Sequence, residues 1–157
     1  YERFCAAQVL VEAADRLVIE DGVPSLAQYR LLLGGLLALG RGELPMTAVV
    51  DSYLLRGLAS AGWAAMTDTC VNCGTTEQLR WFSPQLGGAV CPTCRPPASA
   101  SASPELLVLL GALLAGRWEE VQVVEESLRS RAHGVVSAYA TWHLDHSLRS
   151  LPFLRTN

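Results

Sequence analysis

The chain has 157 residues, half of them hydrophobic, and a net charge of −3. This length suits one folded domain with its own core, and the composition is too apolar for a disordered chain. The two longest apolar runs, residues 31–40 and 106–116, are too short to span a bilayer. No secretory signal is recognisable at the start. The chain has no lysine, which excludes a P-loop lysine and a Schiff-base lysine.

Hydrophobic periodicity predicts three helices in the first part of the chain. Residues 2–20 fit a helix, and Asp21-Gly22-Val23-Pro24 breaks it. Its apolar face is formed by Phe4, Ala7, Val11, Ala14 and Val18. Ser25 is a plausible N-cap for a second helix through Leu39, whose leucines cover nearly the whole circumference. We expect this second helix to be the central, most buried element. Pro45 opens a third helix, with inward residues Val50, Tyr53, Leu54, Gly57 and Leu58.

The pattern becomes helical again after a cysteine-rich segment. Residues 95–104 are rich in proline, alanine and serine, which predicts a mobile loop. Ser103 should begin a fourth helix that runs to about Ala115, and a final helix should cover roughly 125–146. The inward residues of that last helix are Leu128, Ala132, Val135, Tyr139 and Trp142. The expected fold is therefore mainly α, a helical bundle interrupted between its third and fourth helices.

Four of the five cysteines form two C-x-x-C pairs separated by seventeen residues, namely Cys70, Cys73, Cys91 and Cys94. This spacing is typical of a tetrahedral zinc site with four cysteine ligands. Residues 79–82 and 88–90 can pair as short strands between the two cysteine pairs, which gives a zinc-ribbon-like β-hairpin inserted at residues 68–95. Because four thiolates close the ion to water, we expect one structural Zn²⁺.

Other interpretations of these residues are weaker. Two disulfides would need an oxidising compartment, and a redox dithiol needs only one C-x-x-C pair. Iron also fits an all-sulfur tetrahedron, with zinc as the default. Cys5 is most simply a buried helix residue. His143 and His146 have helical spacing, but nothing completes a metal site around them. Trp81 and Phe82 either stack on nucleic-acid bases or, as we favour, cover the core of the small module.

The sequence gives no indication of catalysis. It contains neither G-x-S-x-G nor H-E-x-x-H, and we find no nucleophile–base set, so we expect a protein that is not an enzyme. Charge is unevenly distributed, since residues 127–157 carry four arginines against the single acid Asp145. A basic end on an acidic protein can receive an acidic partner or a phosphate backbone, and an ordinary solvated face is the alternative.

The chain resembles the C-terminal domain of RecO, a family of bacterial recombinational repair proteins. The resemblance is carried by the knuckles "CVNCG" and "CPTC", the surrounding bundle and the ending "LRSLPFL", and it covers essentially residues 1–157. The all-arginine basic content suggests the GC-rich genome of an actinobacterium. Relative to that family, the N-terminal OB-fold, its principal DNA-binding part, is absent from this chain.

The resemblance implies a non-catalytic recombination mediator of the RecF–RecO–RecR pathway, which anneals DNA and helps to load recombinase. Its implied partners are RecR, the acidic tail of the single-stranded-DNA-binding protein, and DNA, in the bacterial cytoplasm near the nucleoid. An acidic tail that ends in a hydrophobic residue requires an apolar groove with arginines at its rim. The candidates for this surface are Arg129, Arg131, Arg149 and Arg155, beside Tyr139, Trp142, Leu151 and Phe153.

The alternative function is a zinc-ribbon nucleic-acid-binding module of the transcriptional type. That function predicts a basic ribbon. Residues 68–95 instead carry two arginines and two acids, so their net charge is zero.

Overall fold

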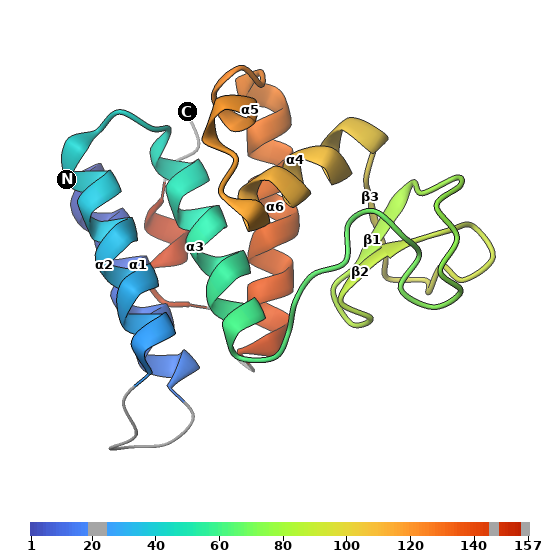
Figure 1. Ribbon diagram of the computed structural model, residues 1–157, viewed down its shortest axis with the longest axis horizontal. Coiled ribbons are helices and arrows are strands. Elements are labelled where there is room, and N and C mark those ends of the chain that lie inside the picture. Colours follow the sequence, from blue (N-terminus) through green and yellow to red (C-terminus); the bar gives the residue numbers. More distant parts are fainter. Residues whose placement is uncertain (19–24, 145–147, 155–157) are drawn as a thin grey trace.

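The computed structural model describes residues 1–18, 25–144 and 148–154. Three helices, α1 (Glu2–Leu17), α2 (Leu26–Arg41) and α3 (Met46–Ser60), form the first half of a bundle. Three more follow after a small sheet: α4 (Pro104–Ala115), α5 (Trp118–Gln122) and α6 (Glu126–His143). Figure 1 shows α3 in the middle of this bundle, with the small sheet set to one side. The fold is mainly helical, as predicted.

Helix α3, not α2, is the central element, because it packs against α1, α2, α4 and α6. Every residue that we expected to face inward on α3 is buried, and so are the polar residues Asp51 and Ser52. Ser52 donates a hydrogen bond from its hydroxyl to the carbonyl of Leu113 on α4, 2.7 Å away. The hydroxyl of Ser52 thus has a partner inside the core, and the bond fixes α4 against α3.

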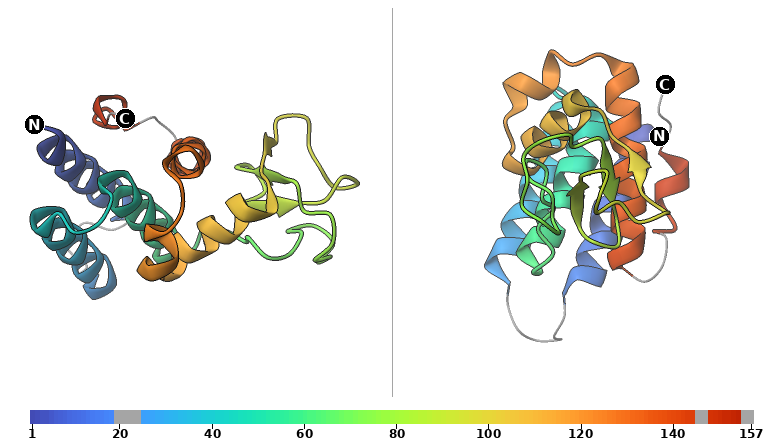
Figure 2. Two further views of the ribbon diagram at one scale, coloured as in Figure 1. Left: turned by 90° about the horizontal axis from the view of Figure 1, so that it is seen from above. Right: turned by 90° about the vertical axis from the view of Figure 1, so that its right-hand side faces the viewer.

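The prediction that α2 is the most buried helix was wrong. Ser25 does cap it, accepting from the amide of Gln28 at 3.4 Å, and Gly42 ends it in the left-handed region at φ 68°. Only Gln28 and Leu39 are buried on α2, whereas four large apolar side chains are exposed, namely Leu26, Tyr29, Leu33 and Leu37. A helix that is apolar all round does not indicate which face meets the core, and α2 lies at the edge of the bundle (Figure 2).

The predicted apolar face of α1 was also wrong. Phe4 and Val11 are 64% and 53% exposed, and the buried face consists of Cys5, Ala6, Val9, Leu10, Ala13 and Leu17. The reason is close packing. A Cβ added at Gly35 on α2 would lie 2.6 Å from a methyl carbon of Leu10, so the contact between α1 and α2 requires small residues. The helix ends at Leu17, and the expected turn at 21–24 lies outside the described residues.

The second half of the bundle largely follows the sequence. Ser103 accepts a hydrogen bond from the amide of Leu106, and α4 ends at Ala115 as expected. Helix α5 was not predicted, since its five residues are too few to establish a periodicity. On α6, three of the five residues expected inside are buried, but Trp142 is 53% exposed. A short 3-10 helix, η1 (Leu151–Phe153), then lies against α1.

The predicted hairpin is present, and it carries a third strand. Strand β1 (Trp81–Ser83) pairs antiparallel with β2 (Gly88–Val90), with Phe82 opposite Ala89. On its other edge β1 pairs with β3 (Ala100–Ser101), in the order β2-β1-β3. The expectation that 95–104 is a mobile loop was therefore wrong for its last part. Residues 100–101 pair with the free edge of β1. This pairing uses backbone groups, so the small side chains of that segment do not prevent it.

Aromatic contacts attach the small sheet to the bundle. Phe82 is 1% exposed, and its ring meets that of Tyr139 on α6 edge to face at 5.6 Å. Tyr139 also donates a hydrogen bond from its hydroxyl to the carbonyl of Trp63 at 3.0 Å. Gly88 forms a parallel bridge with Met66 so close that any Cβ would collide with the Met66 backbone. Phe82 is therefore a core residue of the junction and not a base-stacking platform.

Candidate metal centre and partner-binding pocket

The four paired cysteines converge at one end of the small sheet. The sulfur atoms of Cys70, Cys73, Cys91 and Cys94 all lie within 4.8 Å of one another. Cys73 Sγ and Cys91 Sγ are 3.8 Å apart, far longer than the ~2.05 Å of a disulfide, and all five cysteines are free. In a tetrahedron with Zn–S bonds of ~2.3 Å, the sulfur atoms are about 3.8 Å apart. The four sulfurs therefore fit a zinc ion with four thiolate ligands.

Local backbone turns position these sulfurs. After the first pair, Gly74 adopts φ 72° and donates from its amide to the carbonyl of Cys70 at 2.8 Å. The Cys70 amide in turn donates to the carbonyl of Thr75 at 2.7 Å. Amide groups also point at the sulfurs, since the Cys91 amide lies 3.5 Å from Cys70 Sγ and Asn72 Nδ2 lies 3.3 Å from Cys94 Sγ. Such donors stabilise thiolates and hold them toward a shared centre.

The thiols differ in acidity because of this environment. Burial acts to raise the pKa of Cys70, but hydrogen bonds from the amides of Cys73, Cys91 and Asn72 outweigh it and lower the pKa to about 6. The Thr75 amide acts to lower the pKa of Cys73, yet the neighbouring thiols raise it to about 11. One thiol ionises readily and its neighbour retains a proton, because negative charges so close repel one another. A divalent cation among the sulfurs removes that repulsion and favours four thiolates.

The arginines expected to bind a partner lie on different parts of the surface. Arg129 donates from its guanidinium to the carbonyl of Val124, and Arg131 is exposed near Glu105. Arg149 is exposed on the segment before η1, and Arg155 lies outside the described residues. Of their expected apolar neighbours, Tyr139 and Leu151 are buried, whereas Trp142 and Phe153 are 53% and 61% exposed. Among these, Arg149 and Phe153 line one groove together, against α1.

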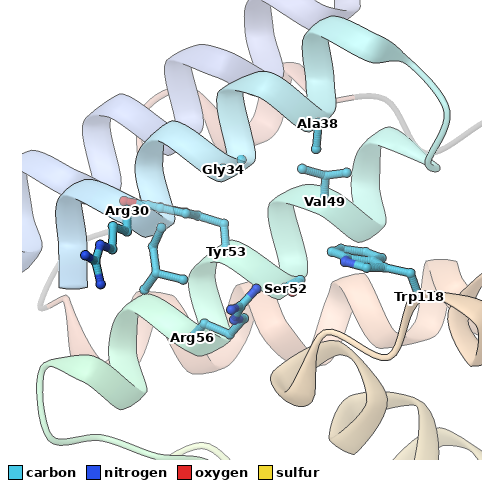
Figure 3. Close-up of a pocket in the computed structure, with 10 residues that line it drawn as sticks. Arg30, Gly34, Ala38, Val49, Ser52, Tyr53, Arg56 and Trp118 are labelled. Carbon is cyan, nitrogen blue, oxygen red and sulfur yellow. The ribbon is translucent and has the colours of Figure 1, made fainter. Parts of the chain in front are cut away.

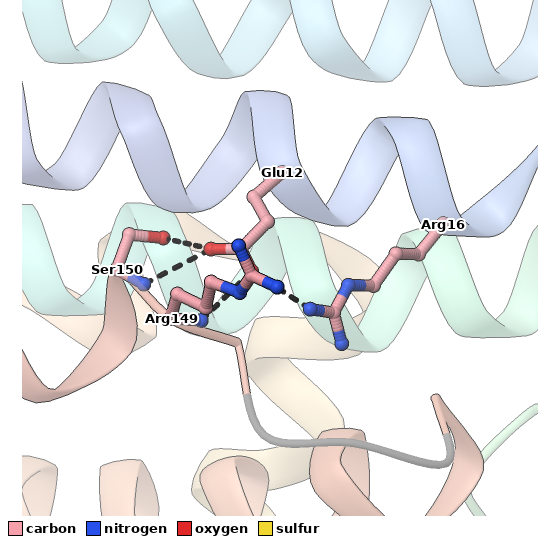
Figure 4. A network of polar contacts seen from close by, with 4 residues as sticks. All are labelled: Glu12, Arg16, Arg149 and Ser150. Atoms are coloured by element: carbon pink, nitrogen blue, oxygen red, sulfur yellow. Dashed lines mark hydrogen bonds and ion pairs between the residues drawn. The ribbon is translucent and has the colours of Figure 1, made fainter.

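Glu12 on α1 fixes the segment that carries Arg149. Its carboxylate accepts from the amides of Arg149 and Ser150 at 2.7 and 2.9 Å and from the Ser150 hydroxyl. Arg16 pairs with it at 2.9 Å, and Figure 4 shows the whole network. Burial acts to raise the pKa of Glu12, but these hydrogen bonds and Arg16 lower it overall. This contact joins residues far apart in the chain and could not be predicted from sequence patterns.

A second pocket, of about 390 Å³, opens between α2 and α3 and was not anticipated from the sequence. Figure 3 shows Arg30 from α2, Arg56 from α3 and Trp118 from α5 around it. Small residues such as Gly34 line the floor of this pocket, and a Cβ built at Gly34 would meet no atom within 4 Å. None of the residues that line it is acidic. The glycine pair inside a leucine-rich helix was the one local signal of this cavity.

The pocket contains a buried polar atom without a partner. Tyr53 is 3% exposed, and its hydroxyl makes no hydrogen bond to any described residue. Burial raises the pKa of Tyr53 to about 12, so the hydroxyl keeps its proton and is available as a donor. Unsatisfied buried polar atoms are uncommon in proteins. The hydroxyl of Tyr53, which has no hydrogen-bond partner, and the guanidinium groups of Arg30 and Arg56 therefore provide donors for an anionic group that enters the pocket.

Comparison with known proteins identifies related chains. Residues 1–152 match the family model described as "Recombination protein O C terminal". The chain is 46% identical, over 98% of its length, to a protein named DNA repair protein RecO from Nocardioides sp.. It is 46% identical to the protein of that name from Cutibacterium acnes and 44% identical to that from Streptomyces avermitilis. The match spans only 64%, 64% and 62% of these three relatives.

Proposed function

Because the chain belongs to the RecO family, we propose that it serves in bacterial DNA repair and recombination as a non-catalytic mediator. The observation that carries the proposal is the match along nearly the whole chain to RecO proteins, the first of them from actinobacteria. In this function the protein assists annealing of DNA and loading of recombinase by binding RecR, DNA and the single-stranded-DNA-binding protein. No helix in the described part of the chain has the length and apolarity needed to cross a membrane. We place the protein in the cytoplasm, near the nucleoid.

We assign one structural Zn²⁺ to Cys70, Cys73, Cys91 and Cys94. The sulfur spacing and the amide donors around these sulfurs support this assignment. Four thiolates leave no open position on the ion, so the metal supplies folding free energy and not a reactive water. The ion would join the two cysteine knuckles that flank the β1–β2 hairpin.

We further propose that the acidic tail of the single-stranded-DNA-binding protein binds the pocket between α2 and α3. Carboxylates in this pocket can accept hydrogen bonds from Arg30, Arg56 and the Tyr53 hydroxyl. The small residues of the floor and the Trp118 ring provide an apolar surface beside these donors. The groove beside Arg149 suits this tail less well, because the acids Glu12 and Asp15 offset the arginines Arg16 and Arg149 that line it. Arg129 and Arg131 on α6 remain the candidates for RecR.

The two surfaces can be separated by measuring affinity for a fluorescent acidic tail peptide by anisotropy. Arg30→Ala or Arg56→Ala should each weaken binding by about tenfold or more, because a hydrogen bond to a charged group contributes about 1.5–3 kcal/mol. Arg131→Ala and Arg149→Ala serve as matched controls and should leave the affinity unchanged. If only these controls lose affinity, the tail binds at the end of the chain instead. If all four variants bind like the wild type, the tail proposal fails.

A nucleic-acid-binding ribbon of the transcriptional type is the alternative function. Trp81, the other aromatic candidate for base stacking, is half-buried, and Arg95 covers one face of its ring, with the guanidinium carbon 4.7 Å from the ring centroid. The neutral charge balance of residues 68–95 also disfavours it. Affinity of the chain for single-stranded DNA, measured at several salt concentrations, distinguishes the two functions. A steep salt dependence that Arg80→Ala and Arg95→Ala abolish would favour the ribbon.

A further inference from the structure

Helix α1 presents a second apolar face, which is bordered by η1 and has exposed side chains. Phe4, Val11 and Val18 follow one another at seven-residue spacing and are 64%, 53% and 43% exposed. Seven residues are close to two helical turns, so the three side chains share one stripe. The opposite face of α1 packs in the core. Large apolar side chains exposed together on one helix face are a feature of interaction sites.

Phe4 and Val11 of this stripe line one wall of a preformed groove. The groove has a volume of about 790 Å³, and its other wall is the segment that carries Arg149 and Phe153. Phe153 is 61% exposed there, and Tyr1 is 90% exposed at the rim. Glu12 fixes the second wall to α1 through hydrogen bonds to two backbone amides. The groove therefore does not need to be assembled when a partner arrives.

The relatives indicate what fills the groove. About a third of each relative lies outside the match, and the matching family model describes a C-terminal part, so the remaining part precedes it in those proteins. In such a protein the preceding part joins α1 at Tyr1, which lines the groove. The groove also carries charges of both signs, Asp15 with Arg149, which suits the mixed surface of a folded domain better than a polyanion.

We propose that this groove is the docking surface for the N-terminal part that the longer relatives carry. Apolar side chains of that part cover Phe4, Val11 and Phe153, and its covalent connection to α1 keeps it close to the groove. The exposed stripe on α2, with Tyr29 and Leu33, stays free in this arrangement.

Hydroxyl-radical footprinting tests the proposal by comparing this chain with the same chain extended by the N-terminal part. Labelling of Phe4 and Phe153 should fall severalfold in the extended protein. Tyr29, which is 61% exposed on α2, is the internal control and should be labelled equally in both. Equal labelling of Phe4 and Phe153 in the two proteins, or protection of Tyr29 in their place, would overturn the proposal.

A variant pair separates docking from folding. In the extended protein Val11→Asp should restore labelling of Phe153, whereas Leu33→Asp, at a similarly exposed position of α2, should not. Val11→Asp should leave the melting temperature of the shorter chain unchanged, because the side chain is exposed there. If protection of Phe153 in the shorter chain rises with protein concentration, a second copy occupies the groove and the proposal is wrong.

Discussion

Replacing Asp51 by Asn should weaken the contact between α3 and α6 in a way that depends on pH. Asp51 Oδ1 lies 2.7 Å from His133 Nδ1, and the two residues are 2% and 9% exposed. Burial acts to lower the pKa of His133, but Asp51 raises it overall, and burial raises the pKa of Asp51. Both directions mean that the folded pair binds a proton more tightly than the unfolded chain does.

The sign of the pH dependence follows from proton binding. Above pH 6.5, the ordinary pKa of histidine, the unfolded chain loses its proton while the folded pair keeps one. The stabilisation from the pair is therefore complete below that pH and is lost as pH rises through the folded pKa. Removing one partner of a buried ion pair costs about 3–5 kcal/mol. At about 2–4 °C per kcal/mol for a domain of this size, Asp51→Asn should lower the melting temperature by roughly 6–20 °C at pH 6.

The assay is thermal unfolding of wild type and Asp51→Asn between pH 6 and pH 9. The deficit should shrink with rising pH to about 1 kcal/mol, because asparagine can still share a hydrogen bond with a neutral imidazole. Glu43→Gln removes the same charge at an exposed position and should change little. A deficit that stays constant across this range, or no deficit at pH 6, would refute the reasoning.

Three other changes test the remaining contacts. Elemental analysis should find one zinc per wild-type chain. The Cys91→Ser variant should lose this zinc, because the four sulfurs act together, and the Cys5→Ser variant should keep it. Equal metal content in both variants would contradict the site. Gly88→Ala should destabilise the chain by about 1–3 kcal/mol in denaturant unfolding, because its Cβ meets the neighbouring backbone, and wild-type stability would contradict that contact. Glu12→Gln should speed hydrogen exchange at the Ser150 amide. Because the pKa of Glu12 is lowered in the folded chain, the wild-type protection of the Ser150 amide from exchange is present above the unfolded pKa of this carboxyl. That protection is lost as pH falls through the folded pKa. Protection of the Ser150 amide that persists in acid would count against the contact.

Features determined by short stretches of sequence could be predicted. The spacing of the cysteine pairs and the strand residues between them indicated both the convergence of the sulfurs and the β1–β2 hairpin. Caps behaved likewise, since the side chains of Ser25 and Ser103 each accept a backbone hydrogen bond at a helix start. In each case the residues that determine the feature lie a few positions apart or have one strongly preferred chemistry.

Features that depend on how helices meet could not be predicted. On α1 the periodic residue Phe4 lies outside, whereas Leu10 is buried, because Leu10 fits closely against Gly35 of α2. The α2–α3 pocket brings Arg30 and Trp118 together from distant parts of the chain. Periodicity identifies a helix, but the identity of its neighbours decides which side is buried.

The hydrogen bonds between Glu12 and the amides of Arg149 and Ser150 also bear on how the chain is made. They join positions 137 and 138 residues apart, so α1 leaves the ribosome long before its last partner has been translated. Contacts with such separation form slowly because they must close a long loop. Until translation reaches Ser150, the Glu12 carboxylate can pair with Arg16 one helical turn away but not with these amides, so native packing on the outer side of α1 is completed late.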